Sequence, residues 1–173
     1  MYFILLLQES EVFPMSLERA IAHLARFGLE DRIQLFQESS ATVELAAHAV
    51  GCEPAHIAKT LSFRVNDAPV LIVAAGDAKI DNSKFKAQFH TKAVMLPFEE
   101  VEPLVGHGVG GVCPFGVNEN VTVYLDISLK RFPIIYPAAG TAASAVKLTP
   151  DELERASGSL GWIDVCKAWQ ENP

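Results

Sequence analysis

The hydrophobic positions in the first third of the chain change from helical to extended spacing and back. Ser16 is a candidate helix cap, and the apolar residues after it recur at i, i+3 and i+4, which predicts an amphipathic helix that ends near Gly28. Thr42, with Glu44 in the first turn, predicts the start of a second helix that Gly51 ends. The predicted elements of this third are helices at 16–27, 42–51 and 54–58 and a strand at 33–36.

The rest of the chain is rich in predicted strands. Residues 59–65 alternate with period two, whereas residues 69–75 are apolar throughout, as in a strand covered on both faces. A capping box at 149–152, with proline at the first helical position, predicts a last helix. The remaining predictions are helices from Asp81 or Asn82 to Phe89 and at 98–105, and strands at 93–96, 121–125, 134–138 and 143–148.

These elements fit one domain of the α/β class, of the α+β type. The closing strands are short and joined by turns, which favours a mixed, largely antiparallel sheet over a doubly wound parallel one. We expect this sheet to curve or to close into a barrel, with helices on its flanks. No repeat or linker divides the chain, so the sequence predicts a single domain at 15–173.

Residues 1–14 are set apart from this domain. They begin with an apolar run of about seven residues, far short of the ~20 that a membrane-spanning helix needs. No Lys or Arg precedes the run, and Gln8, Glu9 and Glu11 follow it, which is unlike a signal peptide. We interpret residues 1–14 as an N-terminal extension, either an extra strand or the product of an upstream start.

The composition narrows the classes of function. The 173 residues include 14 Lys and Arg against 21 Asp and Glu, which gives a net charge of −7, and half of them are hydrophobic. This balance argues against a disordered chain and against a duplex-DNA coat, which needs a broad basic surface. It leaves room for a small nucleic-acid end held in a local basic patch. Three widely spaced cysteines are typical of reduced thiols in a cytoplasmic protein.

Lys59 is the first residue that suggests a site. Strand alternation places it on the same face as Leu61, Phe63 and Val65, which is the face expected to point inward. An inward lysine costs free energy unless it has a partner. Two interpretations stay open. The ammonium reaches water from the start of the strand, or it lies at the floor of a pocket and binds an anionic or carbonyl group.

Residues 106–116 form a loop that holds five of the chain's eleven glycines. Glycines let a backbone approach a ligand closely and aim several N–H groups at it, so the segment 110–116 is suited to an oxyanion hole or to a ribose or carbonyl. The segment matches neither a Walker loop nor a dinucleotide fingerprint. The alternative is a tight connection between two elements without a ligand.

Candidate nucleophiles and metal ligands are few. Cys113 follows His107 by six residues, and a thiol enzyme would need the two side chains in contact. A buried, unreactive cysteine is the common alternative. The sequence has no GxSxG motif, and its five histidines show no metal-ligand spacing, so we predict no metal and no cofactor.

Lysines gather in two places along the chain. One group surrounds the helix predicted to end at Phe89, and a second spot is Lys130 with Arg131. Such groups are either solvated surface or contacts for a few phosphates. The first group consists of Lys79, Lys84, Lys86 and Lys92.

Several of these features occur together in one known family. Gly-Cys-Glu-Pro at 51–54 leads into His-Ile-Ala-Lys-Thr-Leu-Ser-Phe at 56–63, and Gly-Gly-Val-Cys-Pro-Phe-Gly follows at 110–116. An aspartate closes the strand at 123–126, and Ala-Gly-Thr at 139–141 precedes the last predicted strand. In these features the sequence, from about Ser16 to Val165, resembles the YbaK/EbsC family, the editing domain associated with prolyl-tRNA synthetase.

The resemblance implies a mixed α/β domain around a curved sheet and a free-standing trans-editing hydrolase that deacylates mischarged aminoacyl-tRNA. It implies that the lysine matching Lys59 is important for activity and that the loop matching 110–116 lies at the active site. It also implies that no protein side chain is the nucleophile, because water or a substrate hydroxyl takes that part. A catalytically silent module that binds tRNA or a synthetase is the alternative function.

From these implications we expect Lys59, Gly110 and Gly111 to be catalytic, with loop amides binding the ester carbonyl. The expected partners are the acceptor end of a mischarged tRNA and an aminoacyl-tRNA synthetase, in the cytoplasm, with no DNA and no membrane. The residues expected to bind the substrate are Phe36, Val112, Cys113, Pro114, Phe115, Gly116, Asp126 and Gly140.

The sequence departs from better-known members of the family at three places. Phe36 stands where some carry a tyrosine, and Val112-Cys113 stands where others carry a serine before the proline. Residues 138–143 are small and apolar, whereas members that clear cysteine have Gly-Gly-Lys/Arg-Arg-Gly there. Because pocket-lining residues decide which amino acid fits, the specificity of any one member is not transferred.

Overall fold

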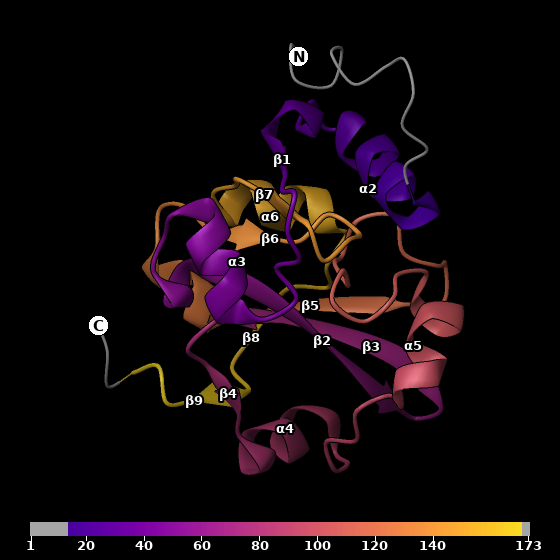
Figure 1. Cartoon of the computed structure of the whole chain (residues 1–173). Coiled ribbons are helices and arrows are strands. Elements are labelled where there is room, and N and C mark those ends of the chain that lie inside the picture. The colour runs from indigo at the N-terminus through magenta and orange to yellow at the C-terminus, as the bar shows by residue number, and fades with distance from the viewer. Residues whose placement is uncertain (1–13, 171–173) are drawn as a thin grey trace.

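The computed structural model describes residues 14–170. Apart from Pro14, the predicted N-terminal extension lies outside the described residues. Within them the chain forms a five-stranded main sheet with two short ribbons and five α-helices (Figure 1). The strands of the main sheet, in spatial order, are β6 (Tyr136–Pro137), β2 (Ile57–Val65), β3 (Ala68–Ala75), β5 (Thr122–Asp126) and β8 (Trp162–Ile163).

The main sheet is mixed, as predicted. Its centre is the antiparallel hairpin of β2 and β3, whose turn residues Asn66 and Asp67 both have positive φ, 51° and 62°. Asn and Asp tolerate this left-handed conformation better than most residues, which suits a two-residue hairpin turn. The other three pairings, β2–β6, β3–β5 and β5–β8, are parallel. Among the five strands, antiparallel pairing is therefore confined to the hairpin, because the later strands return to the sheet through long connections. The expectation that the sheet is largely antiparallel is thus wrong for the main sheet.

Two antiparallel ribbons complete the strand structure of the described residues. One joins β1 (Ile33–Leu35) to β7 (Ser144–Val146), and the other joins β4 (Lys79–Ile80) to β9 (Cys166–Lys167). In the view of Figure 1 the β1–β7 ribbon lies above the main sheet and the β4–β9 ribbon below it.

The helices lie on both sides of the main sheet. In Figure 1 helix α2 is above the sheet and α4 is below it. Phe85 of α4 packs on Phe63 of β2 with ring centroids 5.1 Å apart, which fixes α4 on that face. The α-helices are α2 (Met15–Ala25), α3 (Val43–Val50), α4 (Asn82–Phe89), α5 (Phe98–Val105) and α6 (Pro150–Ser157). The 3₁₀ turns are Glu30–Arg32, Pro54–His56 and Ile127–Arg131.

Three of the predicted helix starts are confirmed by their caps. The predicted cap at Ser16 is wrong, because α2 already begins at Met15 after Pro14 and the Ser16 hydroxyl donates to Gly140 O instead. The Thr42 hydroxyl accepts from the Leu45 N–H at 3.1 Å, and Asp81 caps α4 in the same way through Lys84 N–H at 3.0 Å. Thr149 and Glu152 form the complete capping box. Such caps satisfy N–H groups that the helix itself leaves without partners.

Two predicted elements differ in the structure. The strand predicted at 93–96 is reduced to one bridge between Met95 and Phe63, because this segment touches the edge of β2 briefly before Pro97 turns it into α5. The helix predicted at 54–58 is a single 3₁₀ turn, since β2 already begins at Ile57. The short strands β4, β8 and β9 were too brief to produce a hydrophobic pattern in the sequence.

Candidate active site

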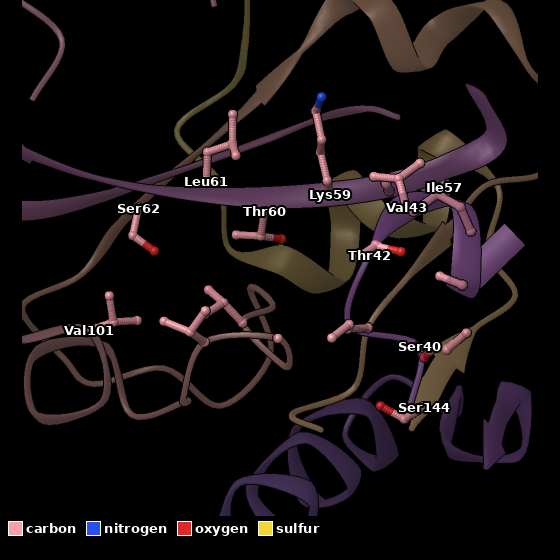
Figure 2. Close-up of a pocket in the computed structure, with 18 of the residues that line it drawn as sticks. Ser40, Thr42, Val43, Ile57, Lys59, Thr60, Leu61, Ser62, Val101 and Ser144 are labelled. Atoms are coloured by element: carbon pink, nitrogen blue, oxygen red, sulfur yellow. The ribbon is translucent and has the colours of Figure 1, made fainter. Parts of the chain in front are cut away.

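A pocket of about 500 Å³ opens on one face of β2. Its walls come from β2, from the segment that leads into α3, from the start of α5, from the glycine-rich loop at Val109, Gly110 and Val112, and from Tyr136, Ala138, Ser144 and Ala145. Segments far apart in the sequence therefore meet around one cavity. Figure 2 labels ten of its lining residues, among them Ser40, Thr42, Thr60, Ser62 and Ser144.

The two faces of β2 divide the strand's side chains between different environments. Figure 2 shows Thr60 and Ser62 on the side of the pocket, while Lys59 and Leu61 point to the other side of the strand. The sequence pattern correctly placed Lys59 and Leu61 on one face. The pocket lies on the opposite face, where the polar residues of the alternation stand.

Lys59 lies at the edge of the pocket, and its ammonium is turned away from the cavity. Its Nζ donates to the carbonyl oxygens of Gly76, at 3.3 Å, and of Ala78. Burial lowers the pKa of this ammonium, because desolvation disfavours the charged form. The ammonium thus binds carbonyl groups, as one of the two interpretations expected, but these carbonyls belong to the backbone that follows β3. Its part in catalysis stays a prediction.

The hydroxyl groups of the pocket are a feature that reasoning from the sequence missed. The Ser40 hydroxyl donates to Ala142 O at 2.6 Å, and the Ser144 hydroxyl donates to Thr141 O at 2.9 Å. Both therefore hold backbone in place. Thr60 differs, because its hydroxyl oxygen is buried and has no hydrogen-bond partner among the described residues. A period-two alternation of Thr60 and Ser62 with apolar neighbours was the signal available in the sequence.

The front half of the glycine-rich loop, Gly110 to Val112, faces the pocket. Gly110 and Val112 line it, and Gly110 has a φ of +98°, a conformation that favours glycine. The N–H of Gly111 donates to Gly108 O at 3.1 Å and is thus used within the loop. Among the hydrogen bonds of residues 14–170, none has the N–H of Gly110 or Val112 as its donor.

Gly111 sets the position of this front half against the chain behind it. A Cβ at Gly111 would lie 2.5 Å from the carbonyl carbon of Gly140 and 2.6 Å from Thr141 Cα. Such distances are shorter than real contacts, so the two backbones can approach this closely because position 111 has no side chain. Gly140 itself has a φ of +89° and packs against Ser16, whose hydroxyl donates to Gly140 O at 2.7 Å.

The back half of the loop, Cys113 to Gly116, belongs to the core. Cys113 and Phe115 have no exposed surface, and neither lines the pocket formed by the described residues. Pro114 is buried as well, and Gly116, with a φ of +70°, packs against the backbone of Arg19. The expectation that these residues contact the substrate is therefore not supported by their placement.

Cys113 and His107 are in contact, but their geometry does not make a nucleophile. His107 Nε2 lies 2.6 Å from Phe115 O and 3.5 Å from Cys113 Sγ. A carbonyl oxygen can only accept, so Nε2 carries a proton and cannot take one from the thiol. Burial raises the pKa of the Cys113 thiol to about 12, and burial lowers the pKa of His107. The thiol therefore stays protonated at neutral pH.

Asp126 and Phe36 lie apart from the pocket-lining residues. The buried Asp126 carboxylate accepts from Ser128 N–H at 3.0 Å and from Val165 N–H at 2.9 Å, which joins the end of β5 to the C-terminal segment. Phe36 is half-buried and extends the β1–β7 ribbon, since its N–H donates to Ala143 O at 2.8 Å. Both placements are those of residues that hold the frame of the site.

The described residues show neither a metal-binding cluster nor a membrane-spanning helix. Within residues 14–170 no group of three or more His, Cys, Asp or Glu side chains is arranged to hold a metal ion. The same part of the chain contains no helix long and apolar enough to cross a membrane. The pocket can thus offer a ligand backbone N–H groups, hydroxyls and apolar walls.

The fold and the pocket define a mixed α/β domain whose glycine-rich loop borders a small-molecule-sized site. The chain belongs to the aminoacyl-tRNA editing domain family, whose model matches residues 37–156. This agrees with the resemblance seen in the sequence.

Relatives and solved structures extend over most of the chain. The uncharacterized protein YwhH of Bacillus subtilis is 51% identical over 157 residues, which cover 90% of this chain and 100% of that protein. A candidate Cys-tRNA(Pro)/Cys-tRNA(Cys) deacylase, EbsC of Enterococcus faecalis, is 28% identical and covers 68% of this chain and 73% of its own. The crystal structure of a candidate trans-editing enzyme for prolyl tRNA synthetase superimposes with a TM-score of 0.81 at 29% identity, covering 90% of this chain and 99% of that one.

Proposed function

We propose that this protein is a free-standing hydrolase that removes the amino acid from mischarged aminoacyl-tRNA. The observation that carries the proposal is the pocket between β2 and the glycine-rich loop. Hydroxyl side chains line it, and so do Gly110 and Val112, whose N–H groups donate no hydrogen bond within the described chain. It occurs in a chain that matches the editing-domain family over residues 37–156.

The proposed reaction is ester hydrolysis in this pocket. Water adds to the carbonyl carbon of the aminoacyl ester, the carbonyl oxygen becomes an oxyanion, and the proton that the water loses passes to the ribose oxygen. The N–H groups of Gly110 and Val112 donate to that oxyanion, a kind of contact worth about 3–4 kcal/mol in the transition state. The bond to the ribose oxygen then breaks, the ribose leaves as a hydroxyl, and the amino acid is released. No protein nucleophile is needed, in keeping with the protonated thiol of Cys113.

Within this proposal Lys59 is a positioning residue. Its ammonium ties β2 to the carbonyls of Gly76 and Ala78, and β2 carries Thr60 into the pocket. The variant Lys59→Ala is expected to lower kcat with little change in KM for the tRNA. Full activity of this variant on the best substrate would remove Lys59 from the site.

The proposed partner is the acceptor end of a tRNA, in the cytoplasm, where tRNA is charged. A net charge of −7 disfavours a broad contact with the tRNA body, so we expect weak and salt-sensitive binding. Contact with a synthetase is part of the proposal. The proline–tRNA ligase of Geobacillus sp. is 33% identical over 90 residues, which are 51% of this chain and 16% of that enzyme.

An unbiased deacylation screen tests the proposal. The full chain is mixed with a panel of tRNAs charged with correct and incorrect amino acids, and the release of each amino acid is measured. We expect rapid release from one or a few mischarged species and little from correctly charged ones. If the protein retains tRNA or a synthetase in a pull-down but releases no amino acid from any species, it is the silent binding module instead.

A further inference from the structure

The mouth of the pocket carries three large apolar side chains that face solvent. Phe98 is 75% exposed, Met95 is 57% exposed and Val109 is 54% exposed, yet all three line the pocket. Exposed apolar side chains gathered at one opening mark a contact surface more often than isolated ones do. Phe98 is the first residue of α5, so its ring lies at the end of that helix.

The mouth is also uncharged. Among the described lining residues, Lys59 and Tyr136 are the ionisable ones, and the Lys59 ammonium is turned away from the cavity. Glu100, beside the mouth on α5, is paired with Arg64 at 2.6 Å. An apolar, neutral surface of this kind suits a flat, uncharged ring and does not suit a phosphate.

We propose that Phe98, flanked by Met95 and Val109, is the stacking surface for the terminal adenine of the tRNA. This inference rests on the proposed function. If the aminoacyl ester lies at Gly110–Val112, the ribose that carries it lies there too, and the adenine is bonded to that same ribose. The base must therefore lie within one nucleotide of the ester, which is at the mouth.

Charge on α5 gives the direction in which the rest of the strand leaves. Glu99 and Glu102 are exposed on this helix, so phosphates that followed the base along α5 would be repelled. The polynucleotide therefore leaves the mouth on the side away from α5. With the strand leaving in that direction, only the terminal base contacts the three apolar side chains at the mouth.

The test combines a protein variant with a substrate variant. A tRNA is completed by ligation with a chemically acylated terminal dinucleotide, which allows the terminal adenine to be replaced by an abasic ribose. Wild type and Phe98→Ala are each measured on both substrates. Stacking on aromatic side chains contributes enough that we expect KM to rise at least about fivefold when either partner is removed. When both are removed, no further rise is expected.

Three controls separate stacking from other effects. Phe98→Tyr keeps a stacking ring and is expected to retain the wild-type KM, whereas Phe98→Leu is expected to behave like alanine. Leu160→Ala removes an equally exposed apolar side chain, 71% exposed, that does not line the pocket, and should leave KM unchanged. Thermal unfolding checks that every variant is folded.

The outcomes are distinguishable from failure of the proposed function. If wild type releases no amino acid from any intact tRNA, the proposed function fails. If wild type is active but Phe98→Ala has a normal KM, or loses affinity equally for intact and abasic substrates, the stacking inference alone is overturned. If sedimentation shows that Phe98→Ala dissociates a dimer that wild type forms, the surface binds a second copy and the inference is overturned as well.

Discussion

The two parts of the segment 110–116, its front and back halves, are adjacent in the sequence and have different roles. Gly110 and Val112 line the pocket, and their N–H groups donate no hydrogen bond within the described chain. Cys113 to Gly116, the next four residues, is buried against α2 and His107. A change in the front half should therefore alter catalysis more than stability, and a change in the back half should do the reverse.

This difference has a physical cause. The back half has bulky side chains, Phe115 above all, that lose contact with water when they pack, and this fixes the loop in place. The front half has little side-chain surface to bury, and two of its residues, Gly110 and Val112, line the pocket. The back half therefore anchors the loop in the core, and the front half borders the cavity.

The largest expected effect is on stability and comes from Phe115→Ala. Phe115 is fully buried, with its ring 5.9 Å from that of His23, and truncating such a residue costs about 3–5 kcal/mol of unfolding free energy. Chemical denaturation measures this loss. Phe98→Ala is the matched control, because an exposed phenylalanine should change the unfolding free energy by less than about 0.5 kcal/mol. Equal costs for the two variants would contradict the division of the loop.

The next largest effect is on catalysis and comes from Gly110→Ala. Alanine at a φ of +98° is strained, and its Cβ would lie 3.2 Å from that of Ala142, so the loop must shift and turn its N–H groups. We expect kcat to fall about 100-fold, as when an oxyanion donor is removed.

Gly28→Ala is the control for backbone strain. Gly28 also has a positive φ, +71°, but a Cβ there meets nothing within 4 Å, and the residue lies beyond α2, away from the pocket-lining residues. Both variants should lose about 1–2 kcal/mol of stability. Only Gly110→Ala should lose activity, and an equal kcat in the two variants would remove Gly110 from the site.

The smallest effect is the pH dependence of unfolding that the back half produces. Burial in the folded chain raises the pKa of the Cys113 thiol from its ordinary value of 9.0 to about 12, so the unfolded chain releases this proton first. Stability should therefore fall as pH rises above about 9, by at most about 1.4 kcal/mol per pH unit for this group. Denaturation at pH 7.5 and 10 measures the loss.

His107 gives the opposite slope at acid pH. Burial lowers its pKa below the ordinary 6.5, so near that pH the unfolded chain binds a proton that the folded chain does not bind. Stability should therefore fall as pH drops below 6.5. Cys113→Ala should remove part of the alkaline loss and leave the acid slope. It should also leave kcat unchanged, and a loss of deacylation in this variant would restore the thiol as a reactive group.

Much of the local structure followed from the sequence, because it depends on neighbours in the chain. The caps at Thr42, Asp81 and Thr149 and the β2–β3 hairpin were predicted from a few adjacent residues. The strand predicted around Met95 is only a single bridge, because the chain turns into α5 soon after it meets β2. Local sequence does not predict where that turn away from β2 falls.

Within the candidate site, the glycine-rich loop was found and its inner division was not. A glycine motif predicts where a backbone can approach a ligand. It does not predict which neighbouring side chains are buried, and Cys113 and Phe115 are buried in the core. The sequence did not identify Thr60 as a site residue, because its hydroxyl matters only once the pocket lies on that face of β2.

The sequence by itself determined the class of domain, the family resemblance, the starts of α3, α4 and α6 and the presence of the glycine-rich loop, since composition, periodicity and motifs are properties of short stretches. The tertiary structure decided which face of β2 borders the pocket, where the Lys59 ammonium lies, and which half of the loop meets the ligand. These depend on contacts between segments more than a hundred residues apart, as between Ser40 and Ala142. Such contacts form only when the whole core packs, and no local pattern encodes them.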